Sequence, residues 1–259
     1  MDYKLHKDIT TFNEWIRITP RIEKEAARIR PVEKPISYER LSKRVFDVLL
    51  AGFGLLMSSW LWVQVIMVII IEDGFPVIIR QKRIGKGGEL FNSFKFRSMI
   101  KSSLNEKVQV QAAENDPRVT SAGKILRKTA LDELPQLLNI LFGEMSFVGP
   151  RALLPSESEI NGNPLITNIA DIPGYEKRIL VQPGLTGISQ IFAPRDLPRK
   201  HKFKYDLLYI KKIGIVYDLR LIISSFLVTF RGAWEKRGTK LKFLKTRNNH
   251  FHHSTSDQK

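Results

Sequence analysis

The sequence predicts an α/β protein in which a membrane-inserted, re-entrant helix near the N-terminus precedes a compact, mainly helical cytosolic domain. Short strands and amphipathic helices at the membrane interface complete this expected architecture. Three observations support it: an uncharged apolar run at residues 48–71, a residue pattern of period two at residues 91–98, and a leucine stripe of helical spacing at residues 134–141.

The apolar run, Val48 to Ile71, would reach about 36 Å as a helix at about 1.5 Å per residue, which is enough for a bilayer core. A buried core helix is the alternative, although cores seldom need so long an uncharged run. Basic residues flank both ends, with Lys43 and Arg44 before the run and Arg80 soon after it. Since positive charge stays on the cytoplasmic side, both ends are expected on one face.

A helix that enters and leaves by the same face has to bend within the membrane. Ser58 and Ser59 lie near the middle of the run, and small or hydroxyl-bearing residues ease a helix kink. We therefore predict the re-entrant break at these two serines.

The rest of the chain divides by composition. After the membrane segment we expect a strand, a glycine turn and a second strand, followed by a helix that begins near Asp132 because Pro135 fits only a first helical turn. The stretch from Asp218 to Trp234 is apolar between basic residues, which favours a helix at the membrane interface. The predicted regions are a polar extension (1–40), the membrane helix (41–72), the main domain (73–235) and a basic tail (236–259).

Composition narrows the chemistry. Lys and Arg number 42 against 26 Asp and Glu, a formal net charge of +16 that favours nucleic acid, anionic lipid or phosphorylated substrates as partners. The chain has no cysteine, which excludes disulfides, thiolate metal sites and cysteine nucleophiles, and only 5 histidines. Chemistry is therefore expected from carboxylates, hydroxyls and cations.

Two adjacent carboxylates, Asp132 and Glu133, are the most informative pair. Neighbouring residues on a helix point about 100° apart, so the two can serve one site in different ways. The alternative is an N-cap, in which Asp132 accepts backbone N–H bonds and the helix dipole favours Glu133.

Arginines beside predicted turns or strands surround the acid pair, and such arginines can hold phosphate oxygens with two hydrogen bonds. For any single arginine, a solvated surface charge is the alternative. The four candidates for phosphate binding are Arg97, Arg118, Arg127 and Arg151, with more weight on the last two.

The order of motifs resembles the bacterial sugar transferases, the monotopic polyprenyl-phosphate phosphoglycosyl transferases, in their small form. The motifs are K-R-V-F-D, Q-K-R-I-G-K-G-G-E-L-F, K-F-R-S-M, N-D-P-R-V-T, L-D-E-L-P-Q-L-L-N-I-L-F-G-E-M-S-F-V-G-P-R and P-G-L-T-G, within residues 41–235. The resemblance implies transfer of a sugar-1-phosphate from a nucleotide-diphospho-sugar, such as a UDP-sugar, to polyprenyl (undecaprenyl) phosphate. It also implies release of UMP, a Mg²⁺ cofactor and a start for exopolysaccharide, capsule, O-antigen or glycoprotein glycan synthesis.

By this resemblance, Asp132 is the nucleophile that forms a covalent phosphosugar intermediate, and Glu133 holds the metal or organises the attack. Residues that shape the site are Gly149, Pro150, Gly184, Thr186, Gly187 and Gln190. The resemblance places the protein in the bacterial inner membrane, with the catalytic domain on the cytoplasmic face, membrane lipids around it and a homodimer as one option.

The sequence departs from the family pattern at several positions. Ser58-Ser59-Trp60 stands where the family has a Ser-Pro pair, which makes a straighter or spanning helix an alternative to re-entry. Gln182 stands where the family has a basic residue before P-G-[IL]-T-G-W, and Arg195 lies in a segment that replaces the usual N-G-R.

Two other functions remain open from the sequence. The first is a catalytically silent, membrane-bound scaffold for glycan assembly, against which the retained acid pair argues. The second is a membrane-anchored nucleic-acid binder, suggested by charge alone. No nucleic-acid-binding motif occurs in the sequence, so we expect no nucleic-acid partner.

Overall fold

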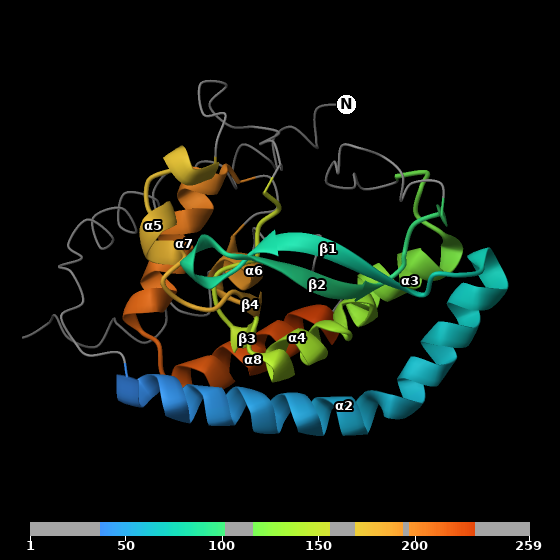
Figure 1. The fold of residues 1–259 in the computed structure, drawn as a ribbon, viewed down its shortest axis with the longest axis horizontal. Coiled ribbons are helices and arrows are strands. Elements are labelled where there is room, and N and C mark those ends of the chain that lie inside the picture. Colours follow the sequence, from blue (N-terminus) through green and yellow to red (C-terminus); the bar gives the residue numbers. More distant parts are fainter. Residues whose placement is uncertain (1–36, 102–115, 156–168, 194–196, 231–259) are drawn as a thin grey trace, which may run out of the picture.

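The computed structural model describes residues 37–101, 116–155, 169–193 and 197–230. Helices of very different length surround two short pairs of strands, with the longest helix, α2, running beneath the others (Figure 1). The mixed helix and strand content expected from the sequence is confirmed. Residues 1–36 of the predicted polar extension, the basic tail and Arg195 lie outside the described residues, whereas residues 37–40 form the start of α2.

Helix α2 extends from Ser37 to Asp73 as one uninterrupted helix of 37 residues. Its part from Leu41 to Asp73 is long and apolar enough to cross a membrane, and the most apolar stretch within it has a mean hydropathy of 2.1. The helix runs almost straight in its first part and then bends, where the ribbon passes from blue to cyan (Figure 1). The bend occurs without a proline.

The two serines in the middle of α2 bond back to the preceding turn. The Ser59 hydroxyl donates to the Leu56 carbonyl at 2.8 Å, and the Ser58 hydroxyl to the Leu55 carbonyl at 3.5 Å. The Trp62 indole N–H donates to Ser58 Oγ at 3.3 Å. Hydroxyls bonded in this way bend helices slightly, so the two serines offer a physical reason for curvature where the family pattern has a proline.

One narrow face of α2 packs against the domain, while most of the helix surface stays exposed. Ala51, Ser58, Val65 and Ile69 lie on the buried face. Only 11% of the most apolar stretch of α2 is buried against the domain, which contradicts the alternative of a buried core helix. The exposed apolar side chains include Leu41, Val45, Leu49, Phe53, Leu56, Met57, Trp60, Val63, Met67, Val68 and Ile71.

The strand, glycine turn and second strand are confirmed as an antiparallel hairpin. Strand β1 (Ile78–Ile84) pairs with β2 (Leu90–Phe96) across the turn η1 (Lys86–Gly88). Gly87 has φ of +71° in this turn, a conformation that L side chains rarely adopt. The hairpin brings Arg83 of β1 and Lys95 of β2 to the middle of the domain, where Arg83 donates to the Ala152 carbonyl at 2.7 Å and Lys95 pairs with Glu133.

The helix that carries the leucine stripe, α4, begins later than the sequence predicts. Helix α3 (Ser121–Thr129) is followed by a 3₁₀ turn, η3 (Leu131–Glu133), and then by α4 (Gln136–Phe142). The predicted start near Asp132 was wrong because a separate turn holds the acid pair and Pro135 immediately precedes α4. No side chain caps either η3 or α4, so the N-cap interpretation of Asp132 was also wrong.

A buried asparagine fixes α4 to the hairpin. Asn139 is completely buried; its side-chain oxygen accepts from the Phe94 N–H at 3.0 Å, and its amide donates to the Asn92 carbonyl at 2.8 Å. The amide also donates to Glu144 at 2.6 Å. Asn139 thus pairs with the outer edge of β2 as a neighbouring strand would, which sets the distance between β2 and the acid pair.

The second half of the domain is built around a short parallel strand pair, β3 (Ser146–Val148) and β4 (Gly184–Thr186). Helices and a 3₁₀ turn cover it, and the largest core cluster forms between α6, α7, α8 and Val148. The covering elements are η4 (Ile169–Asp171), α5 (Tyr175–Arg178), α6 (Ile188–Phe192), α7 (Arg199–Lys211) and α8 (Ile215–Phe230).

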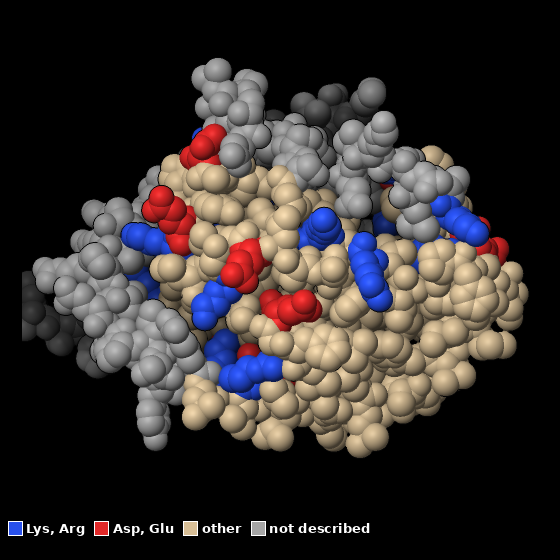
Figure 2. Space-filling view, in the orientation of Figure 1, with Lys and Arg blue, Asp and Glu red and all other residues tan. Residues whose placement is uncertain are grey.

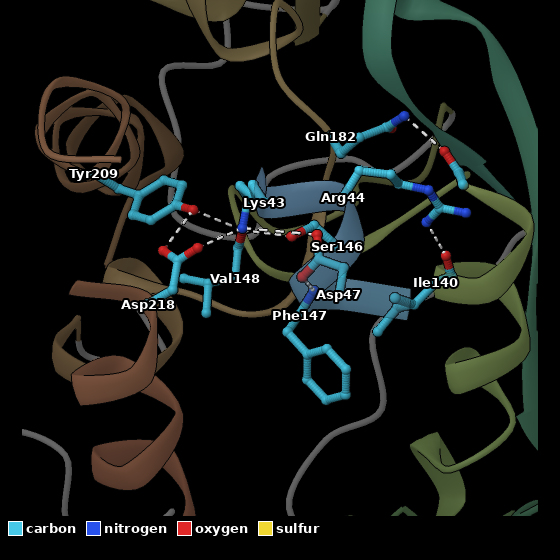
Figure 3. Close-up of polar contacts among 11 residues, drawn as sticks. Lys43, Arg44, Asp47, Ile140, Ser146, Phe147, Val148, Gln182, Tyr209 and Asp218 are labelled. Carbon is cyan, nitrogen blue, oxygen red and sulfur yellow. Dashed lines mark hydrogen bonds and ion pairs between the residues drawn. The ribbon is translucent and has the colours of Figure 1, made fainter. Parts of the chain in front are cut away.

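A polar network joins the first turns of α2 to this core (Figure 3). Lys43 forms an ion pair with the completely buried Asp218 of α8 at 2.5 Å, and the Tyr209 hydroxyl lies 2.9 Å from Asp218 and 2.8 Å from the Val148 carbonyl. Asp47 accepts a hydrogen bond from the Phe147 N–H at 3.1 Å. The K-R-V-F-D motif therefore attaches α2 to β3, α7 and α8.

The same motif also reaches α4. The Arg44 guanidinium donates to the Ile140 carbonyl (Figure 3). It also donates to the Leu141 carbonyl at 2.6 Å. Both carbonyls belong to the last turn of α4, where unpaired carbonyls and the helix dipole favour a cation. Gln182 donates to the next exposed carbonyl, that of Gly143, at 2.6 Å.

Candidate active site

The acid pair lies where the hairpin crosses the start of α4. Glu133 forms an ion pair with Lys95 of β2, with 2.7 Å between Oε1 and Nζ. Both side chains are mostly buried, with exposed fractions of 21% for Glu133 and 15% for Lys95. Because Asn139 fixes β2 against α4, the backbone of Lys95 cannot move away from the acid pair without disturbing buried hydrogen bonds.

Glu133 and Lys95 open onto a narrow pocket between the hairpin, α4 and the β3–β4 pair. The pocket carries three cations, one carboxylate and two glutamines, a composition suited to a phosphorylated and hydroxylated ligand. Its lining residues are Arg83, Ser93, Lys95, Glu133, Gln136, Met145, Arg151, Ala152, Gly184, Leu185 and Gln190.

A wider cavity of about 390 Å³ lies elsewhere, between the start of α2 and the α7–α8 connection. Its walls are mainly apolar, and the one charged side chain in it, Lys43, is already paired with Asp218. The narrow pocket beside Glu133 is therefore the better candidate for chemistry.

The two adjacent carboxylates differ in acidity. Burial, with the charge of Glu133 beside it, raises the pKa of Asp132 to about 6, although Lys95 and Arg127 oppose this. Burial also acts to raise the pKa of Glu133, but Lys95, Arg151 and Arg83 outweigh it and hold that pKa at about 2. Two titratable neighbours whose pKa values are driven apart are typical of a site with two roles.

Three glycines interlock beneath the pocket and hold the V-G-P-R and P-G-L-T-G segments together. A Cβ added to Gly149 would lie 2.4 Å from the Gln182 carbonyl, one on Gly184 would lie 2.0 Å from the Gly149 nitrogen, and one on Gly187 would lie 2.2 Å from the Gly149 carbonyl. Only glycine allows this backbone approach. The segments bond through Gly149 and Thr186 at 2.9 Å and through Gly184 and Pro150 at 2.9 Å.

Arg151 is held in place from behind by Arg178 of α5. The Arg178 guanidinium donates to the Arg151 carbonyl and, at 2.7 Å, to Asp206 of α7. Asp206 also accepts from the Ser189 hydroxyl at 2.7 Å, and Arg178 lies 4.8 Å from the ring of Phe203. These buried contacts leave the Arg151 side chain to line the pocket.

The structure separates the four predicted phosphate-binding arginines into two groups. Arg151 lines the pocket, and Arg127 lies near enough to Asp132 to lower its pKa. Arg97 is instead buried, bonds the Gly74 carbonyl at 2.7 Å and pairs with Asp73 at 3.2 Å. Arg118 pairs with Asp116 at 2.7 Å.

Sequence reasoning missed Lys95, although the K-F-R-S-M motif contains it. Arg97 was chosen there because arginine holds phosphate with two bonds, yet Lys95 lies on the face of β2 that meets Glu133. Arg83 and Gln136 also line the pocket, and the family motifs quoted above contain both of them. Arg178 supports the pocket without a signal in those motifs.

The donor set fits a Mg²⁺ ion held partly by substrate. Among the described residues, no group of three or more His, Asp or Glu side chains could hold a metal. Mg²⁺ in phosphoryl-transfer sites is commonly bound by one or two carboxylates together with phosphate oxygens and water. Glu133, ionised with one oxygen on Lys95, and the adjacent Asp132 provide carboxylates of this kind.

The molecular surface shows how charge is distributed around the site. Basic and acidic side chains alternate across the middle of the face in Figure 2, and a broad uncharged band lies below and to the right, where α2 runs in Figure 1. The exposed apolar residues of α2 supply the side chains for such a band.

The sequence model of the bacterial sugar transferases matches residues 38–232, which include α2, the acid pair and both pocket-forming segments. This chain belongs to the bacterial sugar transferase family. Its predicted membership is therefore confirmed, and the matched region extends to the last described turns of α8.

Curated relatives in the family carry related names. A UDP-glucose:undecaprenyl-phosphate glucose-1-phosphate transferase of Escherichia coli (strain K12) is 38% identical over 236 residues, covering 88% of this chain and 48% of that protein. The exopolysaccharide production protein ExoY of Rhizobium meliloti (strain 1021) is 33% identical over 218 residues, covering 79% of this chain and 89% of ExoY.

A third relative, an undecaprenyl-phosphate galactose phosphotransferase of Salmonella typhimurium, is 32% identical over 210 residues, covering 74% of this chain and 41% of that protein. The chain thus spans about half or less of the transferases named for glucose or galactose, and most of ExoY.

Proposed function

We propose that this member of the bacterial sugar transferase family moves a sugar-1-phosphate from a UDP-sugar to undecaprenyl phosphate, the first step of exopolysaccharide or related glycan synthesis. The observation that carries the proposal is the acid pair with opposite pKa shifts beside Lys95, Arg127 and Arg151. The printed activities of the relatives support the choice of donor and acceptor.

In the proposed first step, a carboxylate oxygen of Asp132 attacks the phosphorus that carries the sugar. A new carboxylate–phosphorus bond forms, and the bond from that phosphorus to the bridging oxygen breaks. UMP leaves with the bridging oxygen and its electron pair. With a pKa of about 6, Asp132 is mainly ionised at neutral pH and more basic than an ordinary aspartate.

In the second step, a phosphate oxygen of undecaprenyl phosphate attacks the same phosphorus. The bond to Asp132 breaks, the carboxylate is restored, and the product is a sugar joined to the lipid by a diphosphate. Lys95 and Arg151 line the pocket and stabilise the negative charge that gathers as two anions meet. Glu133 holds Lys95 in position through their ion pair.

Mg²⁺ would add charge neutralisation at the diphosphate, with Glu133 and Asp132 as its protein ligands. This assignment rests on the donor chemistry of the two carboxylates.

The contacts at both ends of α2 support a re-entrant helix. Near its start, Lys43 and Asp47 bind α8 and β3. At its end, Asp73 pairs with Arg97, and Glu72 accepts from the Ser121 N–H at 2.7 Å. A helix whose two ends bind the same domain is expected to have both ends on one membrane face, here the cytoplasmic face, where nucleotide sugars occur.

Helix α8 adds a second apolar surface. Val216, Leu219, Ile223, Phe226 and Leu227 are exposed by 46% to 66% along it. We propose that this surface lies in the membrane interface beside α2, which brings the pocket to the level of the lipid phosphate.

The test of the transferase activity is UMP release by the purified, detergent-solubilised chain with Mg²⁺, undecaprenyl phosphate and a panel of UDP-sugars. We expect release that requires the lipid and one donor and is lost in Asp132→Asn. Asp171→Asn is the matched control, because Asp171 is exposed and does not line the pocket.

Release that survives in Asp132→Asn would show that another group is the nucleophile. An absence of release with every nucleotide sugar, under conditions where the chain is folded, would instead favour a silent scaffold in a glycan-assembly complex.

The topology can be tested with single cysteines, since the chain has none of its own. Ser42→Cys and Lys101→Cys place exposed thiols in the first turns of α2, ahead of its apolar run, and beyond its end. In intact spheroplasts, both are expected to resist a membrane-impermeant maleimide and to react after permeabilisation. Reaction of Ser42→Cys alone in intact spheroplasts would indicate a spanning helix.

A further inference from the structure

Two glutamines on the pocket wall each bury a polar atom that has no partner in the part of the chain that the structure describes. These atoms are Nε2 of Gln136 and Oε1 of Gln190. The residues are only 5% and 7% exposed, and both line the pocket that contains Glu133. A buried polar atom without a partner is costly, so each requires an explanation.

The orientation of the Gln190 amide is fixed by its neighbours. Its nitrogen donates to the Leu185 carbonyl at 3.1 Å and to the Gly184 carbonyl at 3.3 Å. Backbone carbonyls only accept, so rotating the amide by 180° would lose both bonds. Oε1 is therefore left as an acceptor, and Gly187 makes room for it, because a Cβ at that position would lie 2.6 Å away.

Gln136 supplies the complementary group from the opposite side of the site. It is the first residue of α4, three positions after Glu133 and four after Asp132. Gln136 and Glu133 both line the same pocket, so the glutamine belongs to the site of the acid pair. Nε2 is a donor without an acceptor, and Oε1 of Gln190 is an acceptor without a donor.

A hydroxyl group satisfies both atoms because it donates one hydrogen bond and accepts others. A phosphate oxygen cannot, because at neutral pH it offers Gln190 no hydrogen. We infer that Gln136 and Gln190 bind a hydroxyl of the sugar that is transferred and thereby select the donor. This inference rests on the proposed transferase function and assigns the sugar subsite within it.

A nucleobase also offers donors and acceptors, but the location favours the sugar. The sugar is bonded directly to the phosphorus under attack, whereas the base lies beyond the second phosphate and the ribose. Gln136 is one turn from both carboxylates. In addition, none of the described residues that line this pocket has an aromatic ring for stacking on a base.

The first experiment changes the substrate and leaves the protein intact. The best UDP-sugar from the panel is compared with its monodeoxy analogues and with the same sugar on TDP or CDP, using kcat/KM for UMP, TMP or CMP release. We expect one deoxy analogue to lose roughly 10- to 100-fold in kcat/KM, as for a lost hydrogen bond to a buried group.

The second experiment removes the amides with little change of volume. In Gln136→Met and Gln190→Met, kcat/KM for the parent sugar should fall to the level of that deoxy analogue, and the preference between the two donors should disappear. Gln182→Met is the matched control, since Gln182 bonds the Gly143 carbonyl and does not line the pocket, and it should keep the preference.

Equal turnover of all monodeoxy donors by the wild-type chain would overturn the inference without affecting the proposed function. Variants that stay folded, judged by thermal unfolding, and keep the full preference would also overturn it. Loss of discrimination between UDP and TDP donors alone would assign the glutamines to the base instead. If the wild-type chain releases no nucleotide from any donor, the proposed function and the inference fail together.

Discussion

Asp132→Asn and Glu133→Gln are the same kind of substitution at adjacent carboxylates, yet they should change the free energy of unfolding in opposite directions. The reason is the opposite shift of the two pKa values, to about 6 for Asp132 and about 2 for Glu133. Both variants should lose transferase activity, so only stability distinguishes them.

The expected gain for Asp132→Asn follows from its raised pKa. A change from 3.8 to about 6 means that the folded state disfavours the ionised form. At 1.36 kcal/mol per pKa unit this amounts to about 3 kcal/mol, and partial exposure reduces it to about 1–3 kcal/mol. The penalty is fully present above about pH 6 and absent below about pH 4, so asparagine should stabilise the protein only at the higher pH.

The expected loss for Glu133→Gln follows from its lowered pKa. A change from 4.5 to about 2 means that the folded state favours the ionised form, mainly through Lys95. This stabilisation is present above about pH 4.5 and disappears as the pH falls through about 2. Glutamine removes it and leaves Lys95 without its partner, at a cost of about 1–3 kcal/mol near neutral pH.

The assay is thermal unfolding of the wild-type chain and both variants in one detergent at pH 7.5 and pH 4. For a chain of this size, 1 kcal/mol corresponds to about 2–4 °C in Tm. We expect Asp132→Asn to melt above the wild type and Glu133→Gln below it at pH 7.5, with the first difference vanishing at pH 4. A decrease in Tm of similar size for both variants at pH 7.5 would refute this account of the electrostatics.

Three further predictions concern the pH profile, the support of the site and the membrane surface. The kcat/KM for UMP release should fall about tenfold per pH unit below about pH 6, as Asp132 becomes protonated, and a flat profile down to pH 5 would contradict its role. Asn139→Ala should lower the free energy of unfolding by about 2–4 kcal/mol in denaturant titrations, because two backbone groups of β2 lose their partners; an effect below 1 kcal/mol would argue against it. Phe226→Asp on α8 should weaken binding to phospholipid vesicles at every salt concentration. For Lys212→Asp, on the exposed α7–α8 connection, the difference in vesicle binding from the wild type should depend mainly on salt. Equal vesicle binding by Phe226→Asp and the wild type would place α8 outside the interface.

Local patterns in the sequence were sufficient for several elements. The uncharged run predicted α2, because composition over consecutive residues is enough to recognise a long apolar helix. The period-two alternation of side chains and the glycine turn within residues 78–96 predicted the hairpin, because this pattern too depends only on neighbouring residues. The acid pair was recognisable through its motif, although its 3₁₀ turn was not, since Pro135 is compatible with either arrangement.

The choice of cation beside the acid pair needed the tertiary structure. Lys95 and Arg97 are two residues apart and point to the same side of an ideal strand, so periodicity could not separate them. The end of β2 at Phe96 and the pairing of Arg97 with Asp73 separate them in space. That arrangement depends on α2 and on Asn139, both remote in sequence.

What the sequence alone determined was membership in a family, a long apolar helix, a hairpin and the carboxylates of the candidate site. Only the tertiary structure decided which polar residues are buried and what they bind: Asn139 on β2, Arg178 on the Arg151 carbonyl, and Gln136 and Gln190 on the pocket wall. The physical reason is that burial and hydrogen bonding depend on partners from distant segments, whereas helix and strand patterns depend on neighbouring residues.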